Sequence, residues 1–466
     1  MNRAKPYFFC GIGGSGMLPL ACIVRGLGHQ VGGSDRSLDQ GRIADKFVFL
    51  EAQGISLFPQ DGSGLTSPEQ ILVTSAAIEA TVPDVEAARR LGAEHLTRPQ
   101  LLAQLFNEAQ TGIAVGGTSG KSTVTGMIGW ILHEAGRRPT VMNGAVMKNF
   151  VSPATPFASA LVGDGEIFAS EVDESDGSIA LYRPRIAVLN NITLDHKSLD
   201  ELRHLFGDFA MKAERIVLNL DDDETRLLAA VLPPDRVVTY SLADDGADYF
   251  ADEVNEEPFA ISFALRTRSG GLAERVRLSV PGRHNVSNGL AAIAAAHLAG
   301  VPLEAAAAAI GSFQGLRRRM ELVGTANGIT IIDDFGHNPD KIAATLETLH
   351  AFPGRLLCFF QPHGYGPLRV MRQELIGCFA DNLGPEDVLI MPDPVYLGGT
   401  VDRSVGTAEI IGGVQALGRR GEHVPERAAC GERLAELAQP GDRILIMGAR
   451  DDTLSQFASD LLARLQ

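Results

Sequence analysis

The chain has 466 residues, of which 45% are hydrophobic and 21% carry charge. A single hydrophobic core does not grow to this size, so at roughly 150 residues per domain the length predicts about three domains. The formal net charge is −16. We therefore do not expect a nucleic acid as the main ligand, because no overall excess of Lys and Arg is present to displace the counterions of a polyanion.

The cysteines and the apolar segments favour a cytoplasmic protein without a membrane segment. Five cysteines are scattered along the chain with no Cys-x-x-Cys pair, which argues against a zinc site and predicts buried, reduced thiols. Four glycines interrupt the apolar start at residues 7–24, so a strand and a turn explain it better than a signal peptide. The alanine-rich stretch 290–313 is typical of two packed helices rather than a membrane span.

Short apolar runs alternate with longer helical stretches throughout the chain. Runs of this length, bounded by Gly, Asp and Asn, are typical of strands in a parallel sheet that is buried on both faces. The fold class is therefore α/β, repeated three times. The predicted strands include 7–13, 112–118, 185–191, 215–220, 328–335, 355–360 and 443–449.

Two boundaries divide the chain into the predicted domains 1–108, 109–313 and 314–466. A helical stretch ends before the predicted strand at Ile113, and a cluster of turn and charged residues follows Phe313. Polar and apolar residues alternate between about 242 and 282. This alternation predicts antiparallel strands inserted in the middle domain.

The first glycine-rich segment, GIGGSGM, follows the first predicted strand and precedes a helix. Gly11, Gly13 and Gly16 have the dinucleotide-binding spacing, in which glycine lets the backbone approach a pyrophosphate at a helix N-terminus. Asp35 ends the next predicted strand about twenty residues on, where an acidic side chain meets a ribose. A dinucleotide-dependent dehydrogenase is one interpretation of this loop.

A second glycine-rich segment, GGTSGKSTVTG, begins at Gly116 and lies between a predicted strand and a predicted helix. In such a loop backbone N–H groups cradle phosphate oxygens, Lys121 reaches the β- and γ-phosphates, and the Ser122 hydroxyl is a ligand for Mg²⁺. A dehydrogenase leaves this second loop without a role. The two loops together predict a triphosphate at Lys121 and a diphosphate-linked ligand at the first loop.

Acidic side chains follow the predicted strand that ends near Glu171. The segment EVDESD places four carboxylates within six residues, at a strand end where carboxylates hold the magnesium that accompanies a triphosphate. We expect two of the four to be solvated. Asn190, Asn191, Asp195 and His196 lie at another predicted strand end, and the histidine is a candidate for the same site.

Six short motifs occur along the chain in one order: Gly-Thr-x-Gly-Lys-Ser-Thr, Glu-x-Asp-Glu-Ser-Asp, Asn-x-x-x-Asp-His, Gly-x-His-Asn-x-x-Asn, Arg-Arg with a nearby Glu, and Asp-Asp-x-x-His-x-Pro. In these motifs the chain resembles the Mur ligases of peptidoglycan synthesis over essentially its whole length. The resemblance implies an ATP-dependent amide ligase with an N-terminal Rossmann-like domain for a UDP-sugar, a central P-loop ATPase-type α/β domain and a C-terminal Rossmann-like domain. It gives each loop a role, because one would hold the UDP-linked substrate and the other ATP.

The resemblance also implies site residues. Lys121, Glu171 and His196 would be catalytic, and Ser122, Glu171 and His196 would hold Mg²⁺. The UDP-sugar would contact Gly11, Gly13, Gly14, Ser15, Gly16 and Asp35, and ATP would contact Gly117, Thr118, Ser119, Gly120, Lys121, Ser122, Thr123, Asn285, Arg319 and Asp334. We expect His363, Arg369 and Arg450, near predicted strand ends, to meet the amine substrate.

The amine distinguishes two kinds of family member. GIGGSGM, PGRHN and GDRILIMGA resemble members that join UDP-N-acetylmuramate to L-alanine, whereas YRPRIAVLNN and RRRMELVGTANGITIIDDF resemble at least as much the members that use a murein tripeptide. Both kinds have His at Ser119, and usually a second His at Asn338 and a basic residue at Gly364. L-Alanine is the expected amine. The alternative amine is the tripeptide, and the alternative function is that of a non-catalytic Mur-like nucleotide-binding protein. We expect a monomer or a homodimer. Lys212 is the candidate for the modification that a lysine carries in some family members.

Overall fold

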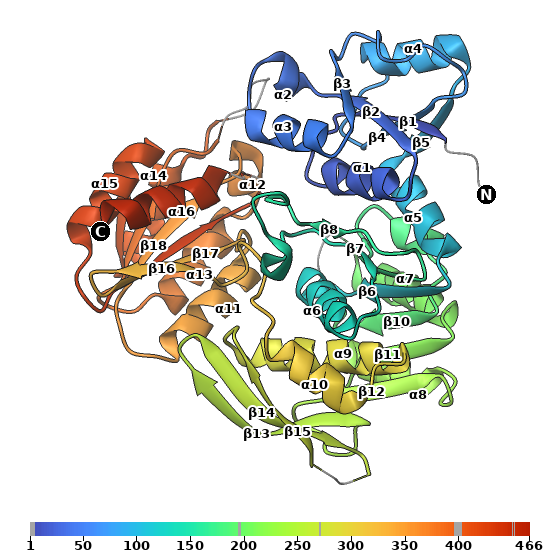
Figure 1. Cartoon of the computed structure of the whole chain (residues 1–466). Helices are drawn as coiled ribbons and strands as arrows, with labels where there is room; N and C mark the ends of the chain where they lie inside the picture. Colours follow the sequence, from blue (N-terminus) through green and yellow to red (C-terminus); the bar gives the residue numbers. More distant parts are fainter. Residues whose placement is uncertain (1–4, 194–196, 270–271, 396–402, 450, 452) are drawn as a thin grey trace. The chain divides into compact units, whose positions relative to one another are not determined.

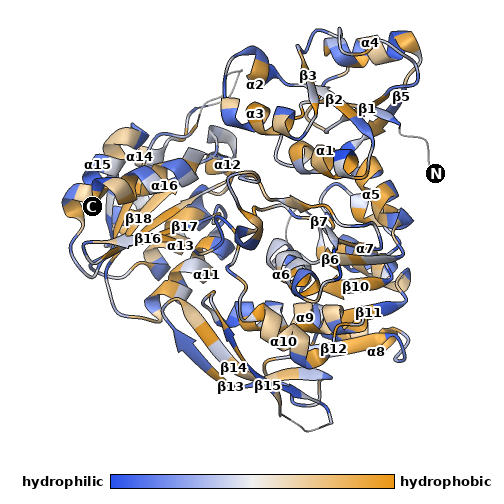
Figure 2. Ribbon diagram, in the orientation of Figure 1, coloured by the Kyte–Doolittle hydropathy of each residue, from blue (hydrophilic) through white to orange (hydrophobic). Residues whose placement is uncertain are grey.

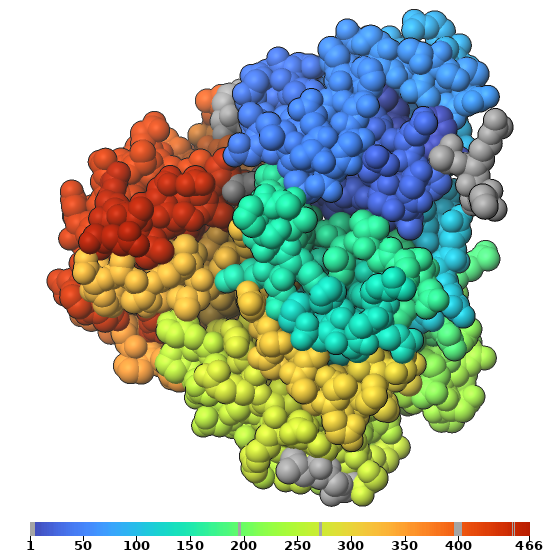
Figure 3. All heavy atoms as spheres, viewed as in Figure 1, coloured from blue at the N-terminus to red at the C-terminus, as the bar shows by residue number. Residues whose placement is uncertain are grey.

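The computed structural model describes residues 5–193, 197–269, 272–395, 403–449, 451 and 453–466, and the others are grey in Figures 1 and 3. The chain forms two compact units. Unit 1 comprises Met1–Asn255, Ile261–Ser279 and Arg283–Gly315, and unit 2 comprises Glu256–Ala260, Val280–Gly282 and Leu316–Gln466. Two predicted site residues, His196 and Arg450, lie outside the described residues.

Unit 1 begins with a parallel sheet of five strands in the order β3-β2-β1-β4-β5. The chain moves outward from β1 to β3 on one side and from β4 to β5 on the other, which makes the carboxyl ends of β1 and β4 a topological switch point. The elements are β1 (Pro6–Cys10), α1 (Met17–Gly26), β2 (Gln30–Ser34), α2 (Arg36–Asp39), α3 (Ala44–Ala52), β3 (Ser56–Phe58), β4 (Ile71–Thr74), α4 (Pro83–Leu91), β5 (Glu94–Thr97) and α5 (Arg98–Glu108).

A sheet of ten strands follows in unit 1, in the order β15-β14-β13-β12-β11-β10-β6-β9-β7-β8. Its central strands pair in parallel, whereas β14 with β15 and β7 with β8 pair in antiparallel fashion. The strands are β6 (Thr111–Gly116), β7 (Thr140–Met142), β8 (Ala160–Leu161), β9 (Ile167–Glu171), β10 (Ile186–Leu189), β11 (Arg215–Asn219), β12 (Val237–Ser241), β13 (Tyr249–Glu257), β14 (Ala260–Thr267) and β15 (Leu272–Leu278). The helices are α6 (Lys121–Glu134), α7 (Leu199–Met211), α8 (Asp223–Val231), α9 (Arg283–Leu298) and α10 (Leu303–Ile310), with 3₁₀ turns η1 (Lys148–Phe150) and η2 (Ser178–Leu181).

Unit 2 is a six-stranded sheet in the order β16-β17-β21-β18-β19-β20, parallel except for the pair β16 and β17. One core packs α11, α13 and α14 against the sheet, and another packs α15 and α16. Figure 2 shows β17 and β18 in hydrophobic colours, as expected for strands covered by helices. The elements are β16 (Glu321–Ala326), β17 (Ile329–Asp334), α11 (Pro339–His350), β18 (Leu356–Gln361), α12 (Tyr365–Val370), α13 (Arg372–Asn382), β19 (Val388–Met391), α14 (Thr407–Ala416), β20 (Arg420–His423), α15 (Arg427–Leu437), β21 (Arg443–Gly448) and α16 (Thr453–Arg464).

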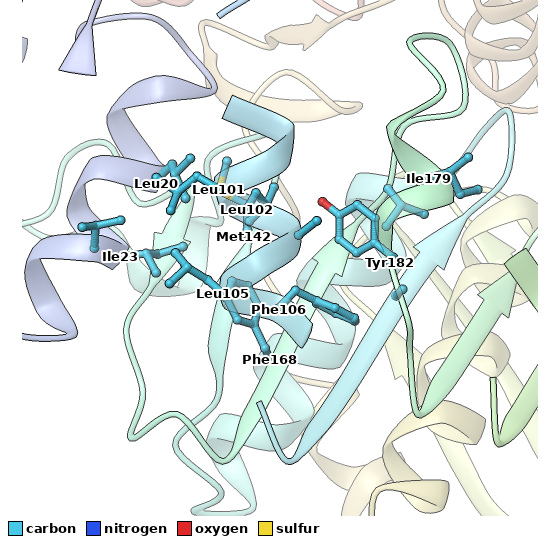
Figure 4. Packing of buried hydrophobic residues seen from close by; sticks show 14 of the residues in the cluster. Leu20, Ile23, Leu101, Leu102, Leu105, Phe106, Met142, Phe168, Ile179 and Tyr182 are labelled. Carbon is cyan, nitrogen blue, oxygen red and sulfur yellow. The ribbon is translucent and has the colours of Figure 1, made fainter. Parts of the chain in front are cut away.

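A single hydrophobic cluster joins the two sheets of unit 1. Figure 4 shows Leu20 of α1 beside Leu101 of α5, Ile23 beside Leu105, and Phe106 of α5 facing the ten-stranded sheet. The ring centroid of Phe106 lies 5.7 Å from that of Phe168 in β9. The five-stranded sheet and the start of the ten-stranded sheet therefore share one core.

The structure confirms the predicted α/β class, the three sheets and the antiparallel insertion at β14 and β15. The two predicted domain boundaries stay a prediction. All five cysteines are free thiols, and Cys10, Cys358 and Cys430 are buried. Among the described residues no helix is both long enough and apolar enough to cross a membrane.

Candidate active site

The loops after β6, β9 and β10 lie at one edge of the ten-stranded sheet. These strands are neighbours, pair in parallel and end at Gly116, Glu171 and Leu189. The carboxyl ends of neighbouring parallel strands bring their loops together, and ligands bind in open α/β sheets at such an edge. The predicted triphosphate loop and the predicted acidic segment therefore meet here.

Two glycines shape the triphosphate loop. Gly117 has a φ of +131° and Gly120 a φ of +83°, and both conformations favour glycine. A Cβ atom at Gly120 would also lie 2.7 Å from Oδ1 of Asn288 and 2.8 Å from Nδ2 of Asn190. Helix α6 begins at Lys121, directly after Gly120, without a side-chain cap. Its first backbone N–H groups have no intrahelical partner and suit an anionic ligand.

Asparagines that follow β10 hold this loop in place. Oδ1 of Asn191 accepts the N–H of Ser119 at 2.9 Å and the hydroxyl of Thr118 at 2.8 Å. Nδ2 of Asn190 donates to the carbonyl oxygen of Ser119 at 3.3 Å. Thr118 is buried and Ser119 is exposed. The asparagines thus act on the loop backbone, a role that the sequence did not indicate.

Lys121 and Ser122 each meet a carboxylate. Nζ of Lys121 donates to the carbonyl oxygen of Gly117 at 2.7 Å and lies 2.9 Å from Oε2 of Glu174, whose side chain is buried. The Ser122 hydroxyl donates to Oε2 of Glu171 at 2.7 Å. A hydroxyl and a carboxylate oxygen in contact at the start of the helix are hard oxygen ligands of the kind that Mg²⁺ prefers. These residues fit the predicted magnesium site.

Asn143 and Gly144, directly after β7, belong to the same site and were not predicted. Nδ2 of Asn143 donates to the carbonyl oxygen of Ser122 at 2.9 Å. A Cβ atom at Gly144 would lie 2.1 Å from Oε1 of Glu171, so glycine leaves room for this carboxylate. In the sequence an Asn-Gly pair indicates only a turn.

Three further residues of unit 1 were singled out from the sequence. Asn285 in α9 is buried, and its Oδ1 accepts a hydrogen bond from Nδ2 of Asn288 at 3.1 Å. Thr123 is half-buried in the first turn of α6. Nζ of Lys212 donates to the carbonyl oxygen of Ala180 at 2.7 Å.

The first glycine loop joins β1 to α1 in the five-stranded sheet. Oδ2 of Asp35 accepts the N–H of Gly13 at 2.9 Å, and Oδ1 accepts the N–H of Ser37 at 2.7 Å. Both oxygens therefore order the backbone, and the ribose contact expected of Asp35 stays a prediction. The other predicted residues of this loop are Gly11 and Gly16, which are half-buried, and Gly14 and Ser15, which are exposed.

In unit 2, Asp334 fixes the backbone beside Arg319. Oδ2 of Asp334 accepts the N–H of Met320 at 2.8 Å, and Oδ1 accepts the N–H of Gly336 at 2.8 Å. The Arg319 guanidinium lies 4.5 Å from the centroid of the Phe335 ring, in a cation–π contact. Both predicted ATP residues of unit 2 thus lie at the carboxyl end of β17.

Arg318 differs from the neighbouring Arg319 in being buried. Its Nε lies 3.4 Å from Oδ1 of Asp333, and its other nitrogens donate to the carbonyl oxygens of Gly448 and Asp451. Burial raises the pKa of Asp333 to about 6, although the charge of Arg318 acts against this rise. Arg318 therefore joins the carboxyl end of β17 to the carboxyl end of β21 and the loop after it, a structural role that the sequence did not separate from that of Arg319.

His363 lies just beyond β18, and its ring centroid is 5.8 Å from that of His337. Nδ1 of His337 lies 3.0 Å from the carbonyl oxygen of Phe335, so Nδ1 carries the proton and Nε2 is left as an acceptor. Burial lowers the pKa of His337 to about 4, and the ring is neutral at pH 7. Arg369 is exposed on α12.

Two departures from the family pattern have local explanations. Gly364 has a φ of +148°, so a basic residue at this position would hold a conformation that side-chain-bearing residues rarely adopt. Asn338 is the N-cap of α11, where its Oδ1 accepts the N–H of Lys341 at 3.0 Å.

The second glycine loop, the carboxylates beside it and three mainly parallel sheets are typical of an α/β enzyme that binds a nucleotide. Family models match the chain in three consecutive stretches: the Mur ligase family catalytic domain at residues 6–110, the Mur ligase middle domain at 115–296, and the Mur ligase glutamate ligase domain at 318–450. The chain therefore belongs to the Mur ligase family.

Its relatives include UDP-N-acetylmuramate–L-alanine ligases. That of Geobacter sulfurreducens is 34% identical over 475 residues and covers 100% of this chain and 98% of the relative. That of Pelotomaculum thermopropionicum is 34% identical over 461 residues and covers 97% of this chain and 96% of the relative.

Solved structures show the same fold. A UDP-N-acetylmuramate–alanine ligase from Thermotoga maritima has a TM-score of 0.76 at 23% identity and covers 99% of this chain and 98% of its own. A murein peptide ligase from Psychrobacter arcticus has a TM-score of 0.72 at 26% identity and covers 99% of both chains. The predicted resemblance and fold are confirmed.

Proposed function

We propose that this Mur ligase joins the carboxylate of UDP-N-acetylmuramate to an amine, L-alanine first, with ATP as the second nucleotide and Mg²⁺ bound beside it. The contact between the Ser122 hydroxyl and Oε2 of Glu171, 2.7 Å long at the start of α6, carries the ATP part of this proposal. The names of the relatives support the UDP-sugar and the amino acid. The cytoplasm suits five free thiols.

The reaction needs an activated carboxylate, because a carboxylate and an amine condense in water very slowly. The γ-phosphoryl group passes from ATP to a carboxylate oxygen of the sugar, with release of ADP, and the amine nitrogen then displaces phosphate and loses a proton. The loop from Gly117 to Gly120 and Lys121 would orient the triphosphate. Bound Mg²⁺ would supply charge neutralisation at Ser122 and Glu171. His196, outside the described residues, is proposed as a further ligand.

The proposal extends to both glycine loops and to unit 2. Asp35 and the loop from Gly11 to Gly16 are assigned to the UDP-sugar. Thr118, Ser119, Thr123 and Asn285 in unit 1, and Arg319 and Asp334 in unit 2, are assigned to ATP. His363, Arg369 and Arg450 are assigned to the amine, on the strength of the family resemblance and of their basic side chains.

A murein tripeptide is the second candidate amine. The glycine-specific backbone at Gly364 replaces the basic side chain usual in the family, which removes one cation from an amino-acid carboxylate site and leaves space for a longer acceptor. The structure of the murein peptide ligase from Psychrobacter arcticus covers 99% of this chain.

Mass spectrometry of products separates these candidates. The purified chain is incubated with UDP-N-acetylmuramate, ATP and Mg²⁺, and with either L-alanine or the tripeptide. We expect UDP-N-acetylmuramoyl-alanine to form faster than the tripeptide product. Tripeptide ligation without detectable alanine product would reassign the amine, and failure to release phosphate with any amine would favour a non-catalytic nucleotide-binding protein.

A further inference from the structure

Arg98 is a cation in the first turn of a helix, where the helix dipole disfavours positive charge. It is the first residue of α5, whose N-cap Thr97 accepts the N–H of Gln100. The positive end of a helix dipole repels a cation in the first turn, and α5 has no acidic residue there. Within the described part of the chain, the half-buried Arg98 side chain has neither a hydrogen bond nor an ion pair. A cation that goes against the preference of the helix N-terminus suggests a functional role.

The Arg98 side chain lies against the first glycine loop. A Cβ atom at Gly16 would be 3.1 Å from Cδ, 3.5 Å from Nε and 3.7 Å from Nη1 of Arg98. Gly16 is also the N-cap of α1, and no side chain caps this helix. An anion bound at the loop N–H groups of Ser15 and Gly16 would therefore meet the guanidinium as well.

The charge of Arg98 also reaches the acidic segment of the ten-stranded sheet. Arg98 interacts electrostatically with Asp173 of this segment. Arg98 therefore lies between the first glycine loop and the segment that surrounds Lys121. Along the chain, Arg98 directly follows β5 of the five-stranded sheet and precedes the first strand of the ten-stranded sheet.

We propose that the Arg98 guanidinium is a positioning residue that binds the diphosphate of the UDP-linked substrate against the first glycine loop. This inference rests on the proposed function. The diphosphate is favoured over the substrate carboxylate because the guanidinium lies against Gly16, whereas no hydrogen bond joins it to the acidic segment. A planar guanidinium donates two parallel hydrogen bonds to phosphate oxygens, which fixes the substrate that must extend toward Lys121.

Calorimetric binding and steady-state kinetics of the full chain test the assignment. In Arg98→Gln we expect the affinities for UDP and for UDP-N-acetylmuramate to fall by the same factor, about tenfold to a hundredfold. The KM for the UDP-sugar rises in step, whereas the KM for ATP and the kcat at saturation stay close to the parent values. Arg98→Lys, which keeps the charge but not the fork, recovers part of the loss. Arg90→Gln removes an exposed arginine of α4 and serves as the matched control.

The outcomes separate this inference from the proposed function. Unchanged affinities in Arg98→Gln, or a loss for UDP-N-acetylmuramate with UDP unaffected, would overturn the diphosphate assignment. If the affinity for ATP fell as much as the affinity for UDP, and the unfolding temperature fell as well, Arg98 would have a structural role instead. If the parent chain binds neither UDP nor UDP-N-acetylmuramate, the proposed function itself is wrong.

Discussion

At the scale of single residues, Lys121 is paired with a buried carboxylate. Its Nζ lies 2.9 Å from Oε2 of Glu174. We expect Lys121→Ala to reduce product formation by at least about a hundredfold, because the phosphates lose their cation. The affinity for UDP-N-acetylmuramate, measured by calorimetry, should change less than twofold, since the first glycine loop belongs to a different sheet. An equal loss of both would contradict the assignment of two separate nucleotide sites.

The same substitution leaves Glu174 buried without its cation, so a loss of folding needs a control. Lys121→Met combined with Glu174→Gln removes both charges and keeps the side-chain volumes. We expect the double variant to unfold near the parent temperature and to remain inactive. Activity in the double variant would mean that Lys121 does not act on the phosphates.

The buried ring of His337 predicts how stability depends on pH. Its pKa is about 4 in the folded chain and 6.5 in the unfolded chain, so between these values only the unfolded chain binds the proton. Its contribution is fully present above pH 6.5 and is lost as the pH falls toward 4, by about 1–2 kcal/mol at pH 5. Denaturation of His337→Gln should therefore show a smaller loss of stability between pH 7 and pH 5 than the parent. A parallel loss in both chains would contradict this origin.

The local arrangement of residues could be predicted where the spacing along the chain determines it. The glycines of both loops, Lys121 and Ser122 follow from a strand, a tight turn and a helix in sequence, which is local information, and Glu171 follows from its place at a strand end. Asn143 and Asn288 reach the same loop from β7 and α9, and only the packing of the sheet reveals them. The roles of the ATP and UDP-sugar residues stay predictions.

At the scale of elements, α5 carries both a core residue and Arg98. The Phe106 ring is fully buried, with centroids 5.7 Å from Phe168 and 5.1 Å from Tyr182. We expect Phe106→Ala to lower the free energy of unfolding by about 3–5 kcal/mol, because the cavity lies where two sheets share a core. Phe259→Ala, at a ring that is 36% exposed, is the control and should cost much less in thermal melts. Equal losses of unfolding free energy in the two variants would mean that the Phe106 ring is not tightly packed in the shared core.

Elements were predictable where burial imposes a pattern. Apolar runs identified β6, β10 and β18 because strands covered on both faces carry few polar residues, and alternation identified the antiparallel pair β14 and β15. The order of the strands within each sheet could not be predicted from the sequence. The insertion of β21 between β17 and β18 depends on long-range pairing that no local pattern encodes.

At the scale of the whole molecule, the two compact units have hydrophobic clusters of their own. The clusters around Phe9 and Phe8 lie within unit 1, and those around Phe360 and Phe359 lie within unit 2. Because a unit with its own core unfolds as a unit, separate cores predict separate cooperative transitions. The first glycine loop belongs to unit 1, so we expect a ligand bound there to stabilise that unit alone.

We therefore expect scanning calorimetry of the full chain to show two transitions. UDP-N-acetylmuramate at a hundred times its dissociation constant should raise the transition of unit 1, with a stabilisation of about 2.7 kcal/mol, and leave the other in place. Phe106→Ala should lower the ligand-responsive transition, which identifies it as unit 1 without cutting the chain. Leu434→Ala, at a buried site in α15, should lower only the other. A single transition that shifts as a whole with ligand and with both substitutions would mean that the units unfold together.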